Sequence, residues 1–224
     1  MKKGCVLMWA TLFIMLFLFG YARAEEFGFN VGLRTWYNDW KISPESGSSN
    51  TSDYTFMLGP NFKVSYGKFF AGASFMASVS DYKFSASKWP RYDLDAMIGY
   101  MVHPRLGLVA GWKYIRGTDN TGISHSVYGP TFGATFNYPI PIEAVNLTFY
   151  LNGAFLPLRG EIRSSGTAND TTYDIIGWSG EAGFAYAPID RLSISLGYKY
   201  QNLDWRHLAN DILSGVTLGV NYAF

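Results

Sequence analysis

The final segment of the chain, Asp211 to Phe224, alternates between two kinds of side chain. Apolar residues occupy one parity and polar or small residues the other; the apolar set is Ile212, Val216, Leu218, Val220, Tyr222 and Phe224, and the opposite set is Asp211, Gly215, Thr217, Gly219, Asn221 and Ala223. A period of two predicts a β-strand with one apolar face. Such a strand suits the edge of a soluble sandwich or the wall of a membrane barrel, so the rest of the chain must decide between them.

Nine earlier segments repeat this alternation: 27–40, 54–66, 69–82, 92–101, 106–115, 127–138, 146–158, 175–187 and 192–203. One face of nearly every segment is apolar and rich in aromatic residues, whereas the other carries Ser, Thr, Asn, Gly and charges. Lipid outside and a polar lumen inside would explain both faces. We therefore predict an all-β fold, a transmembrane up-and-down antiparallel β-barrel of ten strands. The alternative is eight strands, if the segment at 69–82 or 127–138 is misread.

The predicted connections alternate in length, as the periplasmic turns and extracellular loops of such barrels do. The turns are Gly67-Lys68, His103 to Arg105 and Ile189 to Arg191, with a longer one at Pro139 to Val145. The predicted loops are Lys41–Ser52, Lys83–Pro90, Gly117–His125, Arg159–Tyr173 and Asp204–Asn210. We expect Lys41–Ser52 and Arg159–Tyr173 to form the exposed contact surface.

The first 24 residues have the features of an export signal. Lys2 and Lys3 precede an apolar run, and Ala22-Arg23-Ala24 forms an A-x-A cleavage site. We expect a signal peptide at residues 1–24 and one barrel domain at residues 25–224. The single cysteine, Cys5, lies in the signal, which leaves no disulfide framework in the mature chain. A formal net charge of +1 gives no indication of nucleic-acid binding.

The signal, the alternating strands and the terminal VNYAF together resemble small Gram-negative outer-membrane β-barrels of the broad porin, opacity and attachment-protein group. The resemblance covers the whole mature chain. It implies an outer-membrane location and contact with outer-membrane lipids and lipopolysaccharide. No cluster of His or Asp residues has the spacing of metal ligands, so we expect no cofactor or metal. The resemblance also implies that the barrel-assembly machinery reads the C-terminal strand through Tyr222 and Phe224. We expect a monomer.

The resemblance leaves several functions open, because a fold does not determine a function. The first expectation is a structural or adhesin-like surface protein, and the alternative is a narrow porin-like channel for small solutes or ions. A lipid- or peptide-hydrolysing enzyme is less favoured. His125 lies between Ser124 and Ser126, and His207 lies near Asp204 and Asp211, but no nucleophile motif accompanies either histidine. We expect no catalytic site.

An internal repeat predicts charge pairs inside the barrel. Asp95 and Lys113 recur, displaced by 86 residues, as Glu181 and Lys199 (181 − 95 and 199 − 113). Each acid and lysine are almost equidistant from a turn, so an antiparallel register places them opposite each other on the inward face. Arg34 has a similar local sequence and is expected at the same height. These five residues predict a belt of ion pairs that obstructs the lumen; unrelated, solvated charges are the alternative.

Overall fold

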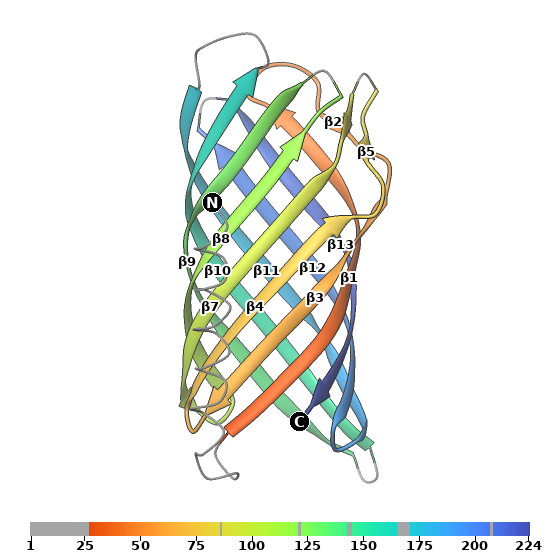
Figure 1. Ribbon diagram of the computed structural model, residues 1–224, viewed down its shortest axis with the longest axis vertical. Coiled ribbons are helices and arrows are strands. Elements are labelled where there is room, and N and C mark those ends of the chain that lie inside the picture. The colour runs from red at the N-terminus through yellow and green to blue at the C-terminus, as the bar shows by residue number, and fades with distance from the viewer. Residues whose placement is uncertain (1–26, 86, 121, 143–144, 165–170, 207) are drawn as a thin grey trace, which may run out of the picture.

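The computed structural model describes residues 27–85, 87–120, 122–142, 145–164, 171–206 and 208–224. The predicted signal peptide at 1–24 lies outside them. Ten long antiparallel strands follow one another around a single sheet, and β13 pairs with β1 to close it into a barrel (Figure 1). They are β1 (Phe27–Pro44), β3 (Thr55–Tyr66), β4 (Phe69–Ser78), β7 (Arg91–His103), β8 (Leu106–Thr118), β9 (Ile123–Ile142), β10 (Val145–Ser164), β11 (Thr171–Ile189), β12 (Leu192–Trp205) and β13 (Ala209–Ala223). The predicted fold and strand number are confirmed, and the eight-strand alternative is wrong.

Three short strands lie among the loops at one end of the barrel. β2 (Asn50–Thr51) pairs with the last part of β1, and β5 (Tyr82–Lys83) pairs with β6 (Lys88–Trp89) to form a small hairpin. We call this end of the barrel the loop end and the opposite end the turn end. At the turn end, Gly67 takes a φ of 55° in the tight connection between β3 and β4, a conformation that glycine adopts without strain.

The predicted long turn at Pro139 to Val145 is wrong, because β9 continues to Ile142. Pro139 and Pro141 pair in register with Thr148 and Asn146 of β10. The backbone amide of Asn137 donates to the carbonyl of Arg105, on the side of β8. The backbone amide positions of Pro139 and Pro141 have the same parity, so they face the same side. β8 begins at Leu106, so the two prolines lie where no acceptor remains on that side. Their missing N–H groups therefore cost the sheet nothing.

The strands also extend farther toward the loop end than the sequence predicts. β1 includes Lys41–Pro44, and β10 and β11 leave only residues 165–170 of the loop predicted at 159–173. The reason is a change of pattern at this end of the barrel. Outward positions become charged, as at Arg159, while the inward Leu156 and Leu158 are buried. The usual apolar-outside alternation therefore fades although the strands continue.

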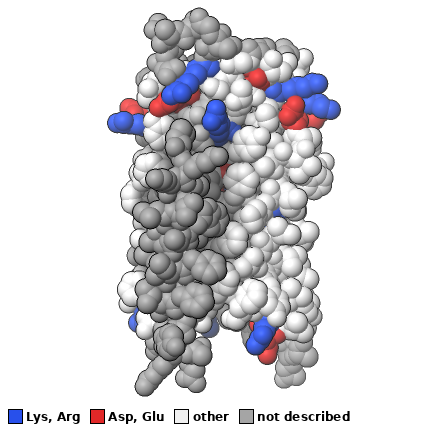
Figure 2. All heavy atoms as spheres, viewed as in Figure 1, with Lys and Arg blue, Asp and Glu red and all other residues white. Residues whose placement is uncertain are grey.

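The outer wall carries a broad apolar band. Leu33, Ile98, Trp112 and Leu196 are each more than half exposed on it. Almost all the charged residues visible on the face in Figure 2 lie near the two ends, with uncharged residues between them. An outward apolar band flanked by aromatic residues is typical of a barrel wall that faces lipid. No helix in the described part of the chain is long and apolar enough to cross a bilayer.

The inside of the barrel changes character along its axis. Toward the turn end it is polar, as predicted, but the half toward the loop end contains two buried apolar clusters. The first comprises Trp36, Trp40, Met57, Met76, Tyr82, Phe84 and Leu213; the second comprises Ile115, Val127, Leu156, Leu158, Ile175, Leu203 and Trp205. The prediction of a polar lumen throughout is therefore wrong for this half.

Candidate functional site

The β5–β6 hairpin forms a plug in the loop end of the barrel. Tyr82 is fully buried and Phe84 is 7% exposed, and both belong to the first apolar cluster. Trp40 of β1 meets the rings of Tyr82, Phe84 and Trp89 at centroid distances of 5.4, 5.5 and 6.2 Å. The segment expected to be a polar surface loop, Lys83–Pro90, thus packs aromatic side chains into the lumen.

Polar contacts fix the position of the plug. The Tyr82 hydroxyl donates to Asn38 Oδ1 at 2.7 Å, and Asn38 Nδ2 donates to the carbonyl of Trp36 at 3.0 Å. Burial raises the pKa of the Tyr82 hydroxyl well above its usual range, so this group stays a neutral donor. The backbone amide of Asp53 also donates to the carbonyl of Lys83 at 3.0 Å. These bonds connect the hairpin to β1 and to the neighbouring loop.

The second apolar cluster closes the other side of the same half. Trp205 packs there and donates from Nε1 to Asp211 Oδ2 at 2.8 Å. His125 lies between the two clusters, with ring centroids 5.4 Å from Trp40, 5.0 Å from Trp89 and 6.1 Å from Trp205. Since these rings come from β1, β6, β9 and β12, the aromatic contacts reach across the lumen from several walls.

The first charge cluster lies on β7 and β8 and extends from the chamber below into the apolar half, where Asp93 is opposite Ile115 in register. Asp95 is opposite Lys113 in register, and Lys113 Nζ donates to the two oxygens of Asp95 at 2.9 and 3.0 Å. Lys113 Nζ also lies 3.7 Å from Asp93 Oδ2. Arg91, which is fully buried, binds the same Asp93 carboxylate through Nε at 2.8 Å and Nη2 at 3.2 Å.

Arg91 is not among the charges predicted for the lumen, because the predicted strand begins one residue later, at Tyr92. A signal was present: Arg91, Asp93 and Asp95 share one parity, and so share one face of the strand. In the structure, Arg91 also lies over the ring of Trp40, 5.2 Å from its centroid. Arg91 therefore connects the charges of β7 to the first apolar cluster above them.

The second charge cluster surrounds Glu181 of β11. Glu181 is opposite Lys199 in register, but its carboxylate pairs with Arg34 of β1 across β12 and β13. Tyr150 and Thr217 also donate to Glu181, at 3.0 and 2.8 Å. Among the described residues, Lys199 has no carboxylate within 4.0 Å, and its Nζ lies 4.4 Å from the ring centroid of Trp36. Arg34, Tyr150 and Thr217 occupy the Glu181 oxygens that the predicted partner would have used.

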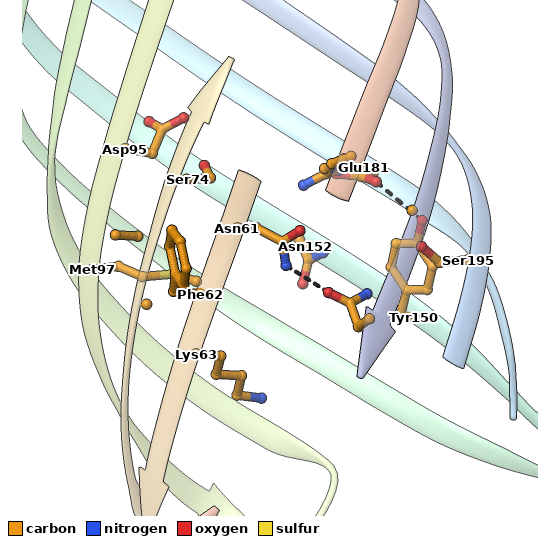
Figure 3. Close-up of a pocket in the computed structure, with 15 residues that line it drawn as sticks. Asn61, Phe62, Lys63, Ser74, Asp95, Met97, Tyr150, Asn152, Glu181 and Ser195 are labelled. Atoms are coloured by element: carbon orange, nitrogen blue, oxygen red, sulfur yellow. Dashed lines mark hydrogen bonds and ion pairs between the residues drawn. The ribbon is translucent and has the colours of Figure 1, made fainter. Parts of the chain in front are cut away.

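A cavity of about 280 Å³ lies on the turn-end side of these charges. Asp95 and Glu181 line it from β7 and β11, which are four strands apart, and Asn61 lies between them in Figure 3. The Asp95 and Arg34 side chains are 39% and 30% exposed, so solvent reaches the lower side of the belt. The lumen is thus a polar chamber with charges and apolar packing above it.

His125 does not form the catalytic pair with Ser124 or Ser126 that the sequence suggests. Adjacent residues of a strand point to opposite faces; His125 is buried in the lumen, whereas Ser124 and Ser126 lie on the opposite parity of β9. His103, expected in a turn, is the last residue of β7 at the turn end, and His207 lies outside the described residues. In the part of the chain that the structure describes, no three His, Cys, Asp or Glu side chains are grouped to hold a metal.

The two C-terminal aromatic residues lie on the outer wall at the turn end. Phe224 is 71% exposed, and its ring lies 5.8 Å from Phe29 and 5.0 Å from Tyr222 between centroids. Its backbone amide donates to the carbonyl of Phe29 at 2.9 Å, which joins the last residue to the first strand. The terminal aromatic pair is therefore at the seam where the barrel closes.

Deleting Phe224 should lower the amount of assembled barrel in cells several-fold, while refolding into detergent micelles stays near that of the wild type. Its ring is mostly exposed in the finished barrel, so a large effect would arise during assembly. Phe69→Ala is the matched control, because Phe69 is 64% exposed on the same rim. The measurement is the fraction of folded protein in membrane extracts. Equal amounts of Phe224-deleted and wild-type barrel would remove the assembly role.

Comparisons with known proteins identify the fold only. No family model matches the sequence, and no curated protein matches it. Among solved structures, the outer membrane protease OmpT from Escherichia coli aligns with a TM-score of 0.58 at 10% identity, covering 90% of this chain and 98% of OmpT. Neisserial surface protein A aligns with a TM-score of 0.46 at 14% identity, over 88% of this chain and 97% of that one.

The closed sheet, its ten antiparallel strands and its apolar outer band agree with the alignment to OmpT. At 10% identity the alignment is a statement about architecture, and the protease activity in the name OmpT belongs to that protein. The chain is a closed up-and-down β-barrel with the fold of Gram-negative outer-membrane barrel proteins.

Proposed function

We propose that the protein is an integral barrel of the outer membrane that does not conduct and acts at the cell surface as a structural or adhesin-like protein. The observation that carries this proposal is the filled half of the lumen. Two apolar clusters and the β5–β6 hairpin occupy the loop end, and the charges around Asp95 and Glu181 lie beneath them. A path for water-soluble molecules would have to pass through both layers.

The orientation follows from the connections. The loop end faces outward and the turn end faces the periplasm, since short turns are periplasmic in such barrels. Crossing the membrane takes about 9–11 residues of a tilted strand. β9, β10 and β11 have 20, 20 and 19 residues, so their upper parts rise beyond the membrane. This extension is the surface that we propose for contact with other molecules.

A narrow channel is the second candidate, and the charge-lined chamber at the turn end is the observation in its favour. Ten strands are close to the size at which side chains fill the interior, so any passage would be narrow. For this chain the chamber is more simply a blind pocket, because the apolar half lies between it and the loop end.

Surface retention tests the proposed role directly. Cells that display the wild-type barrel should bind to immobilised host or cell-surface material more strongly than cells that display a variant with shortened strands β9, β10 and β11. Both proteins should shift between boiled and unboiled gel samples, which shows that each is folded. Equal retention of both cell types at equal display levels would refute the surface role.

A further inference from the structure

The polar chamber on the turn-end side of the lumen offers many unused hydrogen-bonding groups. Its volume of about 280 Å³ is close to the lower limit of the pockets that bind small molecules, about 300–1,000 Å³. The side chains of Lys63, Ser74, Asn152 and Ser195 line it from β3, β4, β10 and β12, and within the described ranges none of them has a hydrogen-bond partner. These groups are therefore available to a molecule inside the chamber.

Lys63 lies on the turn-end side of the chamber. It is three residues from the last residue of β3 (66 − 63), and in Figure 3 it lies on the opposite side of Asn61 from Asp95 and Glu181. Its Nζ atom lies 5.1 Å from the ring centroid of Phe70, an inward side chain that is only 8% exposed. No described carboxylate comes within 4.0 Å of Lys63, so this cation has no ion-pair partner in the chamber.

The charges inside the described barrel change sign along its axis. Within eight residues of the turn end of their strands lie four inward cations and two inward acids, namely Arg34, Lys63, Lys113 and Lys199 against Asp95 and Glu181. The buried charges nearer the loop end are Arg91 against Asp93, Asp119 and Asp211. The two groups cancel over the whole lumen, but the part that contains the chamber has an excess of two positive charges (4 − 2). An anion is therefore more stable there than a cation.

The acceptors of the chamber differ in what they still need. Asp95 and Glu181 line it, but their carboxylate oxygens already accept hydrogen bonds from protein groups. Asn61 Nδ2 donates to Asn221 Oδ1 at 2.6 Å, whereas Asn61 Oδ1 is a buried acceptor without a partner among the described residues. A buried acceptor without a donor costs stability. A hydroxyl group of a bound molecule would satisfy Asn61 Oδ1.

We propose that the chamber binds a small hydroxylated organic anion, a carboxylate or a phosphate ester, that enters from the turn end. The anionic group of this molecule contacts Lys63, while its hydroxyl groups exchange hydrogen bonds with Asn61, Ser74 and Asn152. The ammonium group of a lysine suits either kind of anion, because it is a compact charge without the fixed fork geometry of a guanidinium. The contact with Phe70 holds this ammonium group beside the chamber.

The two ends of the lumen determine how the anion enters. The apolar clusters fill the loop end, whereas the side chains of Asp95 and Arg34 are partly exposed on the side of the chamber. The turn end faces the periplasm in the orientation proposed above, so the anion is a periplasmic solute that binds in a blind pocket. The origin of the anion rests on that orientation, whereas binding itself requires only the chamber and Lys63.

The test is isothermal titration calorimetry of the barrel refolded in micelles of an uncharged detergent. The probes are tartrate and glycerol phosphate, with threitol and glycerol as their uncharged counterparts. We expect Lys63→Ala to lower the affinity for the anions by about tenfold, whereas Lys63→Arg should keep most of it. Lys68→Ala is the matched control, because it removes an exposed lysine from the turn at the same end, and it should bind like the wild type. Added salt should weaken binding of the anions to the wild type.

The comparison of probes also identifies the kind of anion. Binding of only one anion, weakened by Lys63→Ala, would support the proposal and assign the site to carboxylates or to phosphates. Anion affinities of Lys63→Ala within twofold of the wild type would overturn it, and so would threitol or glycerol binding as tight as that of the anions. The same holds if the folded wild type, verified by its gel shift, binds neither anion. Conductance of the same samples in planar bilayers tests the closed lumen separately, so the two proposals can fail independently.

Discussion

Replacing Arg91 by alanine should lower the free energy of unfolding by about 3–5 kcal/mol, the range for removing one partner of a buried ion pair. Arg91 is fully buried and Asp93 is 3% exposed, so the substitution leaves the Asp93 carboxylate out of water with only Lys113 nearby, at 3.7 Å. The substitution also removes the contact between the Arg91 guanidinium and the ring of Trp40. The measurement is a denaturant titration of the barrel in lipid vesicles.

The chain provides a matched control for Arg91→Ala. Arg163 and Glu161 form an arginine–acid pair with the same spacing of two residues on one strand, but their side chains are 61% and 23% exposed. Removing Arg163 should cost about 0–1 kcal/mol, the range for exposed pairs. Equal losses of unfolding free energy for Arg91→Ala and Arg163→Ala would mean that water reaches Asp93 inside the barrel. Burial would then not increase the cost of leaving the Asp93 charge without its arginine.

Opening the apolar half of the lumen should turn a silent barrel into a conducting one. The variant replaces the β5–β6 hairpin by a short glycine turn and carries Trp36→Ala and Trp40→Ala. These changes remove Tyr82, Phe84 and two fully or almost fully buried indoles from the first cluster. Discrete single-channel steps should replace a flat baseline in planar bilayers.

The control for this opened variant is Trp112→Ala/Trp178→Ala. It also removes two indoles, but from the outer wall, where they are 53% and 51% exposed. Its bilayer baseline should stay flat. Continued silence of the opened variant, once gel mobility shows that it is folded, would mean that the second apolar cluster and the charges close the lumen without the plug.

The sequence predicts the walls of this barrel well because lipid imposes one strong pattern on them. Outward Leu33, Leu94 and Phe184 mark strands that the structure contains, and ten strands close the sheet. The register of Asp95 with Lys113 and of Glu181 with Lys199 also follows from the sequence, because both pairs are nearly equidistant from a short connection. Local spacing suffices for contacts between neighbouring strands.

The interior contacts across the lumen could not be predicted in the same way. The pairing of Glu181 with Arg34 joins strands separated by two others, so it depends on the curvature of the whole sheet. The plug was overlooked for a related reason. The segment Tyr82 to Trp89 has Ser and Lys residues typical of a loop and is followed by Pro90, and only the barrel mouth gives its aromatic residues a place to be buried.

Single-channel recording of the wild-type barrel in planar lipid bilayers tests the closed lumen most directly. Refolded protein, verified by its gel shift, is added at high salt under a steady voltage, with the opened variant in a parallel chamber as the positive control. The filled loop end predicts a flat baseline for the wild type. Stable nanosiemens steps from the wild type, at a frequency that rises with the amount of folded protein, would contradict a barrel closed by its own side chains.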